Sequence, residues 1–455
     1  MLKQILKQLL LNLLIVCSIT AASANEPVQK VANSHAFNLD QAINYALANN
    51  PDVQIASERI GQADAQLGEA LSAFYPQITA KVGYQHSNNP VQVFSMAVAQ
   101  RQFDPASINT INHPGYRQNF RPEIIGKLSL FRGGQDYYQS KAAELGIAVA
   151  ELEQSAIRNS LVEMVTATYY GYLAAIEAHK VANDSITAVT SELDQTRKQY
   201  AAGTALKADV LSLEVKLAEA QENQIRAANG IELAMASAKT LLGMATEESF
   251  SLIAPATLPV PVVSTSFAEL LNQALAQRPE LQAATKQVEI SERQIRGEQG
   301  AYLPRADAFV SYGQDSQNPG FSSRQDNVTA GVSVEIDLFS GLNTKNRVSA
   351  AERKAAQARE TERKTRLNIE QEVKTAHLKL QEALARLRVT ETAVSAADEA
   401  LRLVNEQRRA DMVTVTRYLE AETARNKAHA NTITAHYDAL TAETALKQAV
   451  GELSQ

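Results

Sequence analysis

One long stretch of helical pattern, from about residue 133 to 201, dominates the order of apolar and polar positions along the chain. Apolar side chains recur in it at alternating steps of three and four residues, and it contains no proline. This spacing is that of a coiled-coil seam, and such a helix reaches roughly 100 Å at 1.5 Å per residue. The pattern predicts a rod longer than a compact domain needs. Its apolar positions are Leu145, Val149, Leu152, Ala156, Val165, Tyr169, Tyr172, Ile176, Ile186, Val189, Leu193 and Tyr200.

The pattern is repeated within the chain. Residues 37–84 match residues 265–312 without a gap, and a second gapless match pairs Leu130 with Leu338 and continues through the C-terminal helices. The two matches differ in offset, so the first copy carries twenty extra residues between position 84 and Leu130. Self-similarity of this kind predicts two copies of one structural unit. We expect the extra residues to enlarge an external loop.

Each copy predicts the same order of elements: short helices, a β-hairpin, then a long helical hairpin. The first repeat is expected at 25–246 and the second at 266–451, and the proline-containing residues 247–265 between them are expected to form an extended linker. The β-hairpin and the long helical hairpin are expected at about 76–131 and 133–243 in the first repeat, and at about 304–339 and 341–451 in the second.

In the hairpin regions the hydrophobic period changes from 3.6 to 2. The clearest case is 328–338, where Val, Ala, Ile and Leu alternate with polar residues and glycine. Strands of about ten residues with one apolar face fit a soluble sheet or a membrane barrel with a wet interior. In lipid the edge strands need partners. Two copies would then give a filled barrel of about eight strands, and three would give about twelve strands and room for a channel. A hollow helical bundle favours three.

Composition narrows the function. The net charge is −6 and no basic block is present, so nucleic acid is not expected as a partner. The single cysteine is Cys17, which leaves the rest of the chain without thiol chemistry. The seven histidines are scattered and complete no metal-site pattern. We therefore expect no enzyme, no cofactor and no metal.

Residues 1–24 have the pattern of an export signal. Lys3 and Lys7 give a positive start, an apolar run follows, and a small-residue site predicts cleavage after Ala24. A membrane anchor is the alternative, but the apolar run is short for a span. A lipoprotein anchor at Cys17 is a second alternative, weakened by the bulky residue before it. The mature chain is expected to leave the cytoplasm.

Taken together and in order, these features resemble the TolC family of outer-membrane efflux proteins from residue 37 to 451. The resemblance implies a mainly α fold with a membrane β-barrel part. A long α-helical barrel of coiled-coil hairpins would join four strands per subunit, which contribute to a 12-stranded trimeric barrel. The motifs that carry the resemblance are Ala46-Leu47-Ala48 with Pro51, Ala274-Leu275-Ala276 with Pro279, Leu130-Phe131-Arg132-Gly133-Gly134, Leu338-Phe339-Ser340-Gly341, and Tyr200, Gly203 and Asp209-Val210-Leu211.

The resemblance also implies a function. It implies a homotrimeric duct of a tripartite efflux or type I secretion system, set in outer-membrane lipid with a long periplasmic portion. The duct would passively conduct substrates from an inner-membrane pump, with a periplasmic adaptor (membrane fusion protein) as partner. The rival interpretation is a soluble periplasmic coiled-coil adaptor or scaffold. The sequence identifies neither the exported substrate nor the pump.

Two sets of site residues follow from the resemblance. The turns of the helical hairpins would contact the adaptor, and Asp411 stands where the first turn has Gly203. Charges just above the turns would narrow the periplasmic aperture, where three copies create a strong local field. The alternative is that these charges are solvated residues on helix surfaces. The tips are Ala202, Gly203, Thr204, Ala410, Asp411 and Met412, and the aperture residues are Asp209, Arg417 and Glu420.

Overall fold

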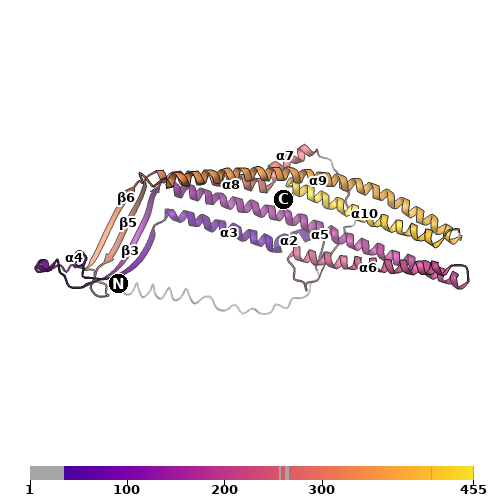
Figure 1. Ribbon diagram of the computed structural model, residues 1–455, viewed down its shortest axis with the longest axis horizontal. Coiled ribbons are helices and arrows are strands. Elements are labelled where there is room, and N and C mark those ends of the chain that lie inside the picture. The colour runs from indigo at the N-terminus through magenta and orange to yellow at the C-terminus, as the bar shows by residue number, and fades with distance from the viewer. Residues whose placement is uncertain (1–34, 256–257, 262–265, 411, 454–455) are drawn as a thin grey trace.

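The protein is an elongated molecule with a β-sheet at one end and two helical hairpins reaching to the other (Figure 1). The computed structural model describes residues 35–255, 258–261, 266–410 and 412–453. The export signal expected at 1–24 lies outside these residues. The two halves of the chain carry the same order of helices and strands, except that the first half has a further helix and a 3₁₀ turn between its two sheet strands.

The two longest helices confirm the coiled-coil pattern. Helix α5 (Gln135–Ala201) and helix α9 (Asn343–Arg409) each contain 67 residues and run the length of the helical part. Each turns back into a helix of 36 residues, α6 (Lys207–Leu242) or α10 (Val415–Val450). None of the helices in the described ranges combines the length and the apolarity that a membrane span requires.

Shorter helices make up the length that α6 and α10 lack. In the first half these are α2 (Leu39–Asn49) and α3 (Pro51–Leu71), and proline begins α3, where its missing N–H costs nothing. In the second half they are α7 (Phe267–Gln277) and α8 (Pro279–Gln299). Helix α3 packs along α5, and α8 lies between α5 and α9.

The end-to-end junctions are held by buried side chains. The Asn50 Nδ2 donates to the Leu241 carbonyl at 2.9 Å, which ties the start of α3 to the end of α6. At the corresponding junction the Arg278 guanidinium donates to the Ala449 carbonyl at 3.2 Å and pairs with Glu372 at 2.9 Å. Both junctions therefore satisfy carbonyls that a helix C-terminus leaves without partners.

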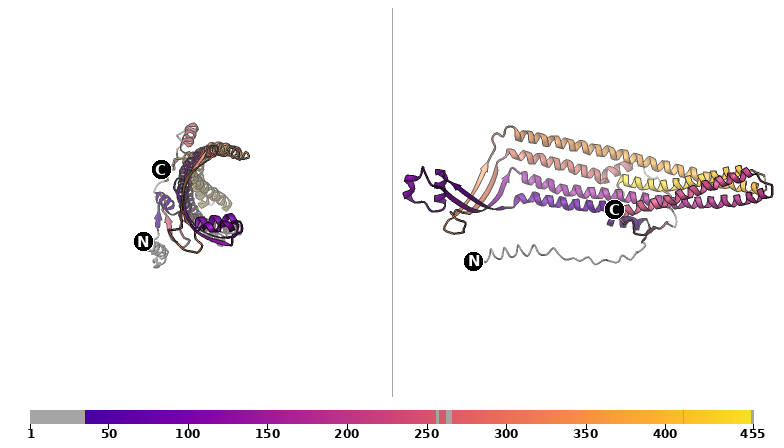
Figure 2. Two further views of the ribbon diagram at one scale, coloured as in Figure 1. Left: turned by 90° about the vertical axis from the view of Figure 1, so that its left-hand side faces the viewer. Right: turned by 60° about the horizontal axis from the view of Figure 1, so that its bottom comes forward.

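The helices lie side by side in a curved layer. Near the sheet the order is α3, α5, α8 and α9, and towards the hairpin tips it is α6, α5, α10 and α9. Viewed end-on, these elements form an open arc (Figure 2). The edge elements of the arc are therefore α3 with α6 on one side and α9 on the other.

Four antiparallel strands form one sheet in the order β2, β3, β5, β6. They are β2 (Gln77–Ser87), β3 (Arg117–Arg132), β5 (Arg305–Gln314) and β6 (Asp326–Glu335). Their register places small or apolar residues opposite one another on a single face, while the other face is mainly polar. The first face contains Ile78, Ala80, Val82, Tyr84, Phe120, Pro122, Ile124, Gly126, Leu128, Ala306, Ala308, Val310, Tyr312, Val328, Ala330, Val332 and Val334.

The strands differ from the expected ones in two respects. Strand β3 contains 16 residues rather than about ten and begins at Arg117, because its N-terminal part pairs with the whole of β2. Strand β6 ends at Glu335, so the alternation of apolar and polar residues, which continues to residue 338, predicted a strand that is three residues too long. Beyond Glu335 the register has no further partner, since β5 begins opposite it.

The expected linker and external loop also contain structure. Within 247–265, strand β4 (Phe250–Leu252) pairs in parallel with β1 (His35–Phe37), so the linker closes back on the start of the first half. The extra residues of the first copy form helix α4 (Pro90–Ala99) and a 3₁₀ turn at Pro105–Thr110.

We predict that Gly243→Ala destabilises the protein, whereas Gly146→Ala does not. Gly243 ends α6 at a φ of 69°, and an added Cβ would lie 2.5 Å from the Asn49 carbonyl oxygen. The left-handed conformation alone costs about 1–2 kcal/mol. Gly146 lies within α5 with open space around it, where alanine gains about 0.5–1 kcal/mol. Thermal unfolding followed by circular dichroism measures both, and equal midpoints for the two variants would contradict the prediction.

Candidate functional site

The first hairpin tip is a tight turn between α5 and α6. Gly203 adopts a φ of 79°, a conformation that glycine takes without steric cost. The Gly203 N–H donates to the Tyr200 carbonyl, and the Thr204 N–H and hydroxyl both donate to the Gln199 carbonyl. Ala202, Gly203 and Thr204 are all exposed, so this tip presents small side chains to solvent at the end of the molecule farthest from the sheet (Figure 1).

The second tip lies at the same end, between α9 and α10. The Ala410 N–H donates to the Glu406 carbonyl, and the Met412 N–H donates to the Gln407 carbonyl at 2.9 Å. Asp411, which was expected to replace the glycine of the first tip, lies outside the described residues. Met412 leaves 74% of its surface exposed. The second tip therefore presents a large apolar side chain to solvent, which the first tip does not.

The three expected aperture residues lie near the starts of α6 and α10: Asp209 and Arg417 in the first turns, and Glu420 in the second turn of α10. Asp209 is in the first turn of α6, and its carboxylate accepts the Leu206 N–H at 3.4 Å. On α10, Arg417 pairs with Glu420 at 3.2 Å, and both side chains are 59% exposed. Within the described ranges, no hydrogen bond or ion pair joins Asp209 to either of them. The structure thus brings together Arg417 and Glu420 but gives Asp209 a separate place.

Sequence reasoning missed a buried ion pair behind the tips. The Arg408 Nε of α9 lies 2.9 Å from a Glu192 carboxylate oxygen of α5, and each side chain is only 11% exposed. An apolar cluster adjoins this level of the hairpins. No sequence pattern pairs two residues 216 positions apart. The cluster contains Val189, Leu193, Leu213, Val404, Val415, Tyr418 and Ala421.

Polar groups continue above this cluster. The hydroxyl-bearing ring of Tyr418 is buried, and burial together with the nearby Glu422 carboxylate raises its pKa. Further up, Asp398 of α9 accepts hydrogen bonds from Arg425 and His429 of α10. Partial burial would raise the pKa of Asp398, but these two hydrogen bonds outweigh it and hold the pKa below its usual value. Helices α9 and α10 are therefore joined by charge as well as by apolar packing.

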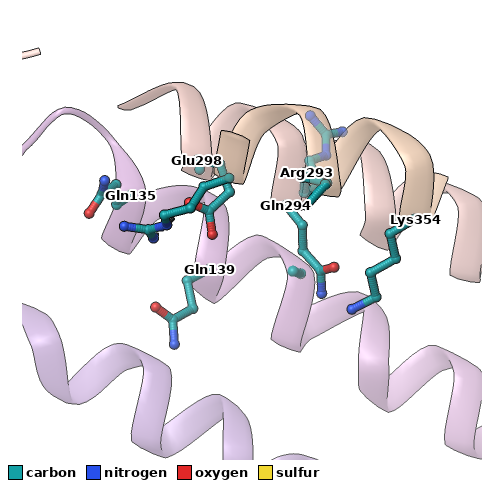
Figure 3. Close-up of a pocket in the computed structure, with 11 residues that line it drawn as sticks. Gln135, Gln139, Arg293, Gln294, Glu298 and Lys354 are labelled. Atoms are coloured by element: carbon teal, nitrogen blue, oxygen red, sulfur yellow. Dashed lines mark ion pairs between the residues drawn. The ribbon is translucent and has the colours of Figure 1, made fainter. Parts of the chain in front are cut away.

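A pocket of about 580 Å³ lies between α5, α8 and α9, and most of the side chains that line it are charged or amide-bearing (Figure 3). Gln294 and Lys354 extend towards the same space in it, and Glu298 is paired with Arg347 at 2.6 Å. Through Gln135 and Arg347 it joins a second hollow, which includes Asp307 on the polar face of the sheet. A continuous wet surface therefore runs from the polar face of the sheet onto the helices.

Comparison with known proteins gives one family. The model of the family described as outer membrane efflux protein matches residues 42–244 and 270–452. The outer membrane protein TolC of Vibrio cholerae is 21% identical over 426 residues, which cover 92% of each chain. The alkaline protease secretion protein AprF of Pseudomonas aeruginosa is 24% identical and covers 73% of this chain and 70% of its own.

Solved structures share the fold. A membrane protein from Pseudomonas aeruginosa superposes with a TM-score of 0.78 at 18% identity, covering 95% of this chain and 100% of its own. The outer membrane protein VceC from Vibrio cholerae superposes with a TM-score of 0.74 at 18% identity, covering 91% of this chain and 96% of its own. The arc of helices and the four-stranded sheet thus form a known architecture.

We predict that Arg408→Met lowers stability by about 3 kcal/mol, because it leaves the Glu192 carboxylate buried without its partner. The double variant Glu192→Met/Arg408→Met should cost much less, since both charges are then absent. Denaturation midpoints of the wild type, the two single variants and the double variant form the double-mutant cycle. The prediction fails if the two single losses simply add in the double variant.

Proposed function

The chain belongs to the outer membrane efflux protein family, whose members are outer-membrane channels of efflux and secretion systems, and we propose that three copies of it close into one duct. It is a channel protein of the outer membrane and not an enzyme. The family membership removes the alternative of a soluble periplasmic adaptor. We infer that the duct spans the periplasm through its helices and the membrane through its strands.

Apolar stripes on the two edges of the arc carry the proposal of a closed ring. Towards the hairpin tips, the edge helices α6 and α9 each have four exposed large apolar residues. At 100° per residue, those of α6 fall within about 80° of arc and those of α9 within about 40°. Exposed apolar stripes of this kind mark interaction surfaces, and a head-to-tail ring would cover each with the other. The stripes are Leu211, Val215, Ile225 and Leu233 on α6, and Leu367, Leu378, Val389 and Leu403 on α9.

The sheet supports the same arrangement. Strands β2 and β6 are its edges, and each has a partner on one side only. An open edge in lipid would leave backbone groups without hydrogen bonds, so β2 would pair with β6 of the next copy. Three copies supply twelve strands, which enclose a channel, whereas two supply eight, which side chains fill. The apolar face would then contact lipid and the polar face would line the lumen.

We propose that the hairpin tips contact the other components of the system. Ala202, Gly203 and Thr204, with the second tip, would meet a periplasmic adaptor that connects the duct to an inner-membrane pump. Their exposure at the end farthest from the sheet supports this role. In a trimer the nearby charged residues would form rings around the entrance. Substrates would pass passively, because the chain carries no energy-coupling site pattern.

We predict that Val215→Glu on α6 and Val389→Glu on α9 each prevent ring closure. A charge buried in an apolar interface loses hydration without gaining a partner. Asn223→Glu is the matched control, since it adds the same charge to another exposed face of α6. Light scattering of the detergent-solubilised protein should give the mass of three chains for the wild type and the control, and of single chains for the other two. Trimers of both edge variants would refute the proposed contact.

We also predict that Arg417→Gln and Glu420→Gln shift ion selectivity in opposite directions. Charge at a constriction selects ions of opposite sign, so loss of Arg417 should favour cations and loss of Glu420 anions. Asp209→Asn should resemble Glu420→Gln. Reversal potentials in planar bilayers under a KCl gradient measure the permeability ratio. Unchanged reversal potentials in all three variants would mean that these residues are ordinary surface charges.

A further inference from the structure

The segment between β2 and β3, residues 88–116, carries α4 beyond the end of the sheet and then returns to it (Figure 1). It carries the twenty residues that the second half lacks, and it begins with helix α4. The C-terminal end of α4 returns to the sheet, where Gln100 is completely buried. In the end-on view α4 lies at one limb of the arc (Figure 2). The face of the sheet that Gln100 contacts decides where this segment lies in the assembled channel.

The strand register identifies that face. Phe120 and Ser316 form a bridge that continues the pairing of β3 with β5, so Asp315 stands opposite Arg121. Directly opposite residues of an antiparallel pair point to the same side. Asp315 and Arg121 therefore share a face with Glu123, which belongs to the polar face of the sheet.

Asp315 is the centre of a buried cluster on this face. Its side chain is almost completely buried, and its carboxylate accepts from Asn119 at 2.6 Å, Asn327 at 2.9 Å and Arg121 at 3.2 Å. Hydrogen bonds to a charged acceptor are about twice as strong as neutral ones. The cluster thus fixes side chains of β3 and β6 against the residue that follows β5, at the external end of the sheet.

Gln100 attaches the segment to this cluster. Its Nε2 donates to the Asn119 Oδ1 at 2.9 Å and to the Gln118 carbonyl at 2.8 Å, and its Oε1 accepts from the Arg117 Nε at 2.9 Å. All the polar atoms of this buried amide group therefore take part in hydrogen bonds, and losing a partner would leave buried groups unsatisfied. The next residue, Arg101, turns the chain with a φ of 53° and donates to the Asp326 carbonyl.

We propose that residues 88–116 of each copy lie on the lumen side of the barrel and narrow its external mouth, and that Gln100 and the Asp315 cluster hold them there. The proposal rests on the proposed ring, in which the polar face lines the lumen. Helix α4 carries no charged residue, and Val91 and Val98 are exposed on it. Uncharged, apolar constrictions oppose the passage of water and ions. The segment would therefore act as a size and polarity barrier at the outer end.

Cysteine labelling from outside the cell tests this barrier without depending on the periplasmic aperture. Thr329 lies on the polar face in the middle of β6 and is exposed. In a Cys17→Ala background, Thr329→Cys would report access through the external mouth of intact cells. A small maleimide and a bulky polyethylene-glycol maleimide are compared. We expect the small reagent to label the wild-type channel and the bulky one to be excluded.

Two neighbouring residues provide the matched variants. Asn119→Ala removes the contact between Gln100 and the cluster, and should raise the rate of bulky labelling at least tenfold. Gln118→Ala lies next to it on the opposite face, where its side chain accepts only the Tyr84 hydroxyl, and should leave the rate within twofold. Replacement of 88–116 by a short Gly-Ser turn should raise the rate as Asn119→Ala does.

The outcomes separate this inference from the proposed function. The barrier is overturned if the bulky maleimide labels position 329 at the same rate in three proteins: the one with the unmodified loop, Asn119→Ala, and the one with the shortened loop. If the small reagent cannot label position 329 even when the loop is shortened, in protein that is present in the outer membrane, the wet barrel itself is overturned. Ser322→Cys, exposed in the connection between β5 and β6, should react with both reagents in every variant and reports the amount of protein.

Discussion

Unpaired edges are the constraint on which the rest of this structure depends. The sheet ends in two strands with one partner each, and the helical layer ends in two helices with exposed apolar stripes. Neither edge is stable as it stands in its proposed surroundings, because lipid offers no hydrogen bonds to the strands and water offers no favourable contact to the stripes. The curvature of the layer brings both kinds of edge to the same two sides of the arc. One head-to-tail contact can therefore satisfy both.

Such a contact requires that neighbouring helices remain aligned over the whole length of the molecule. In each half, a helix of 21 residues (α3 or α8) and a helix of 36 residues (α6 or α10) lie end to end beside one uninterrupted helix of 67 residues. The junctions achieve this with different chemistry in the two halves. A neutral amide, Asn50, serves in one, and a guanidinium, Arg278, held between Glu280 and Glu372, serves in the other. In both halves a glycine in a left-handed conformation ends the 36-residue helix: Gly243 ends α6 and Gly451 ends α10. Without a side chain, each glycine lets the end of the neighbouring short helix approach closely.

The sequence predicted most of the helical part, because coiled-coil periodicity is local and is repeated over many turns. Helices α5, α6, α9 and α10 lie within a few residues of their expected bounds. It predicted the strands less well, since alternation continues past the point where pairing stops, as at residues 336–338. It could not predict the contacts that join distant segments. Glu192 with Arg408, and Gln100 with Asn119, depend on the folded arrangement, and each residue alone has the pattern of an ordinary surface position.

The two ends of the molecule are consequently built for different mechanical roles. At the tips, the charges of Arg417 and Glu420 are exposed and paired only within one helix, so solvent can replace their interaction at little cost. Behind them the Glu192–Arg408 pair is shielded from water, and separating α5 from α9 there would expose two charges that now satisfy each other. At the external end, Asp315 is buried among donors from strands β3 and β6. A partner that widens the channel would therefore separate the exposed charges at the tips at little cost in free energy. The larger cost would come from separating the buried Glu192–Arg408 pair behind them.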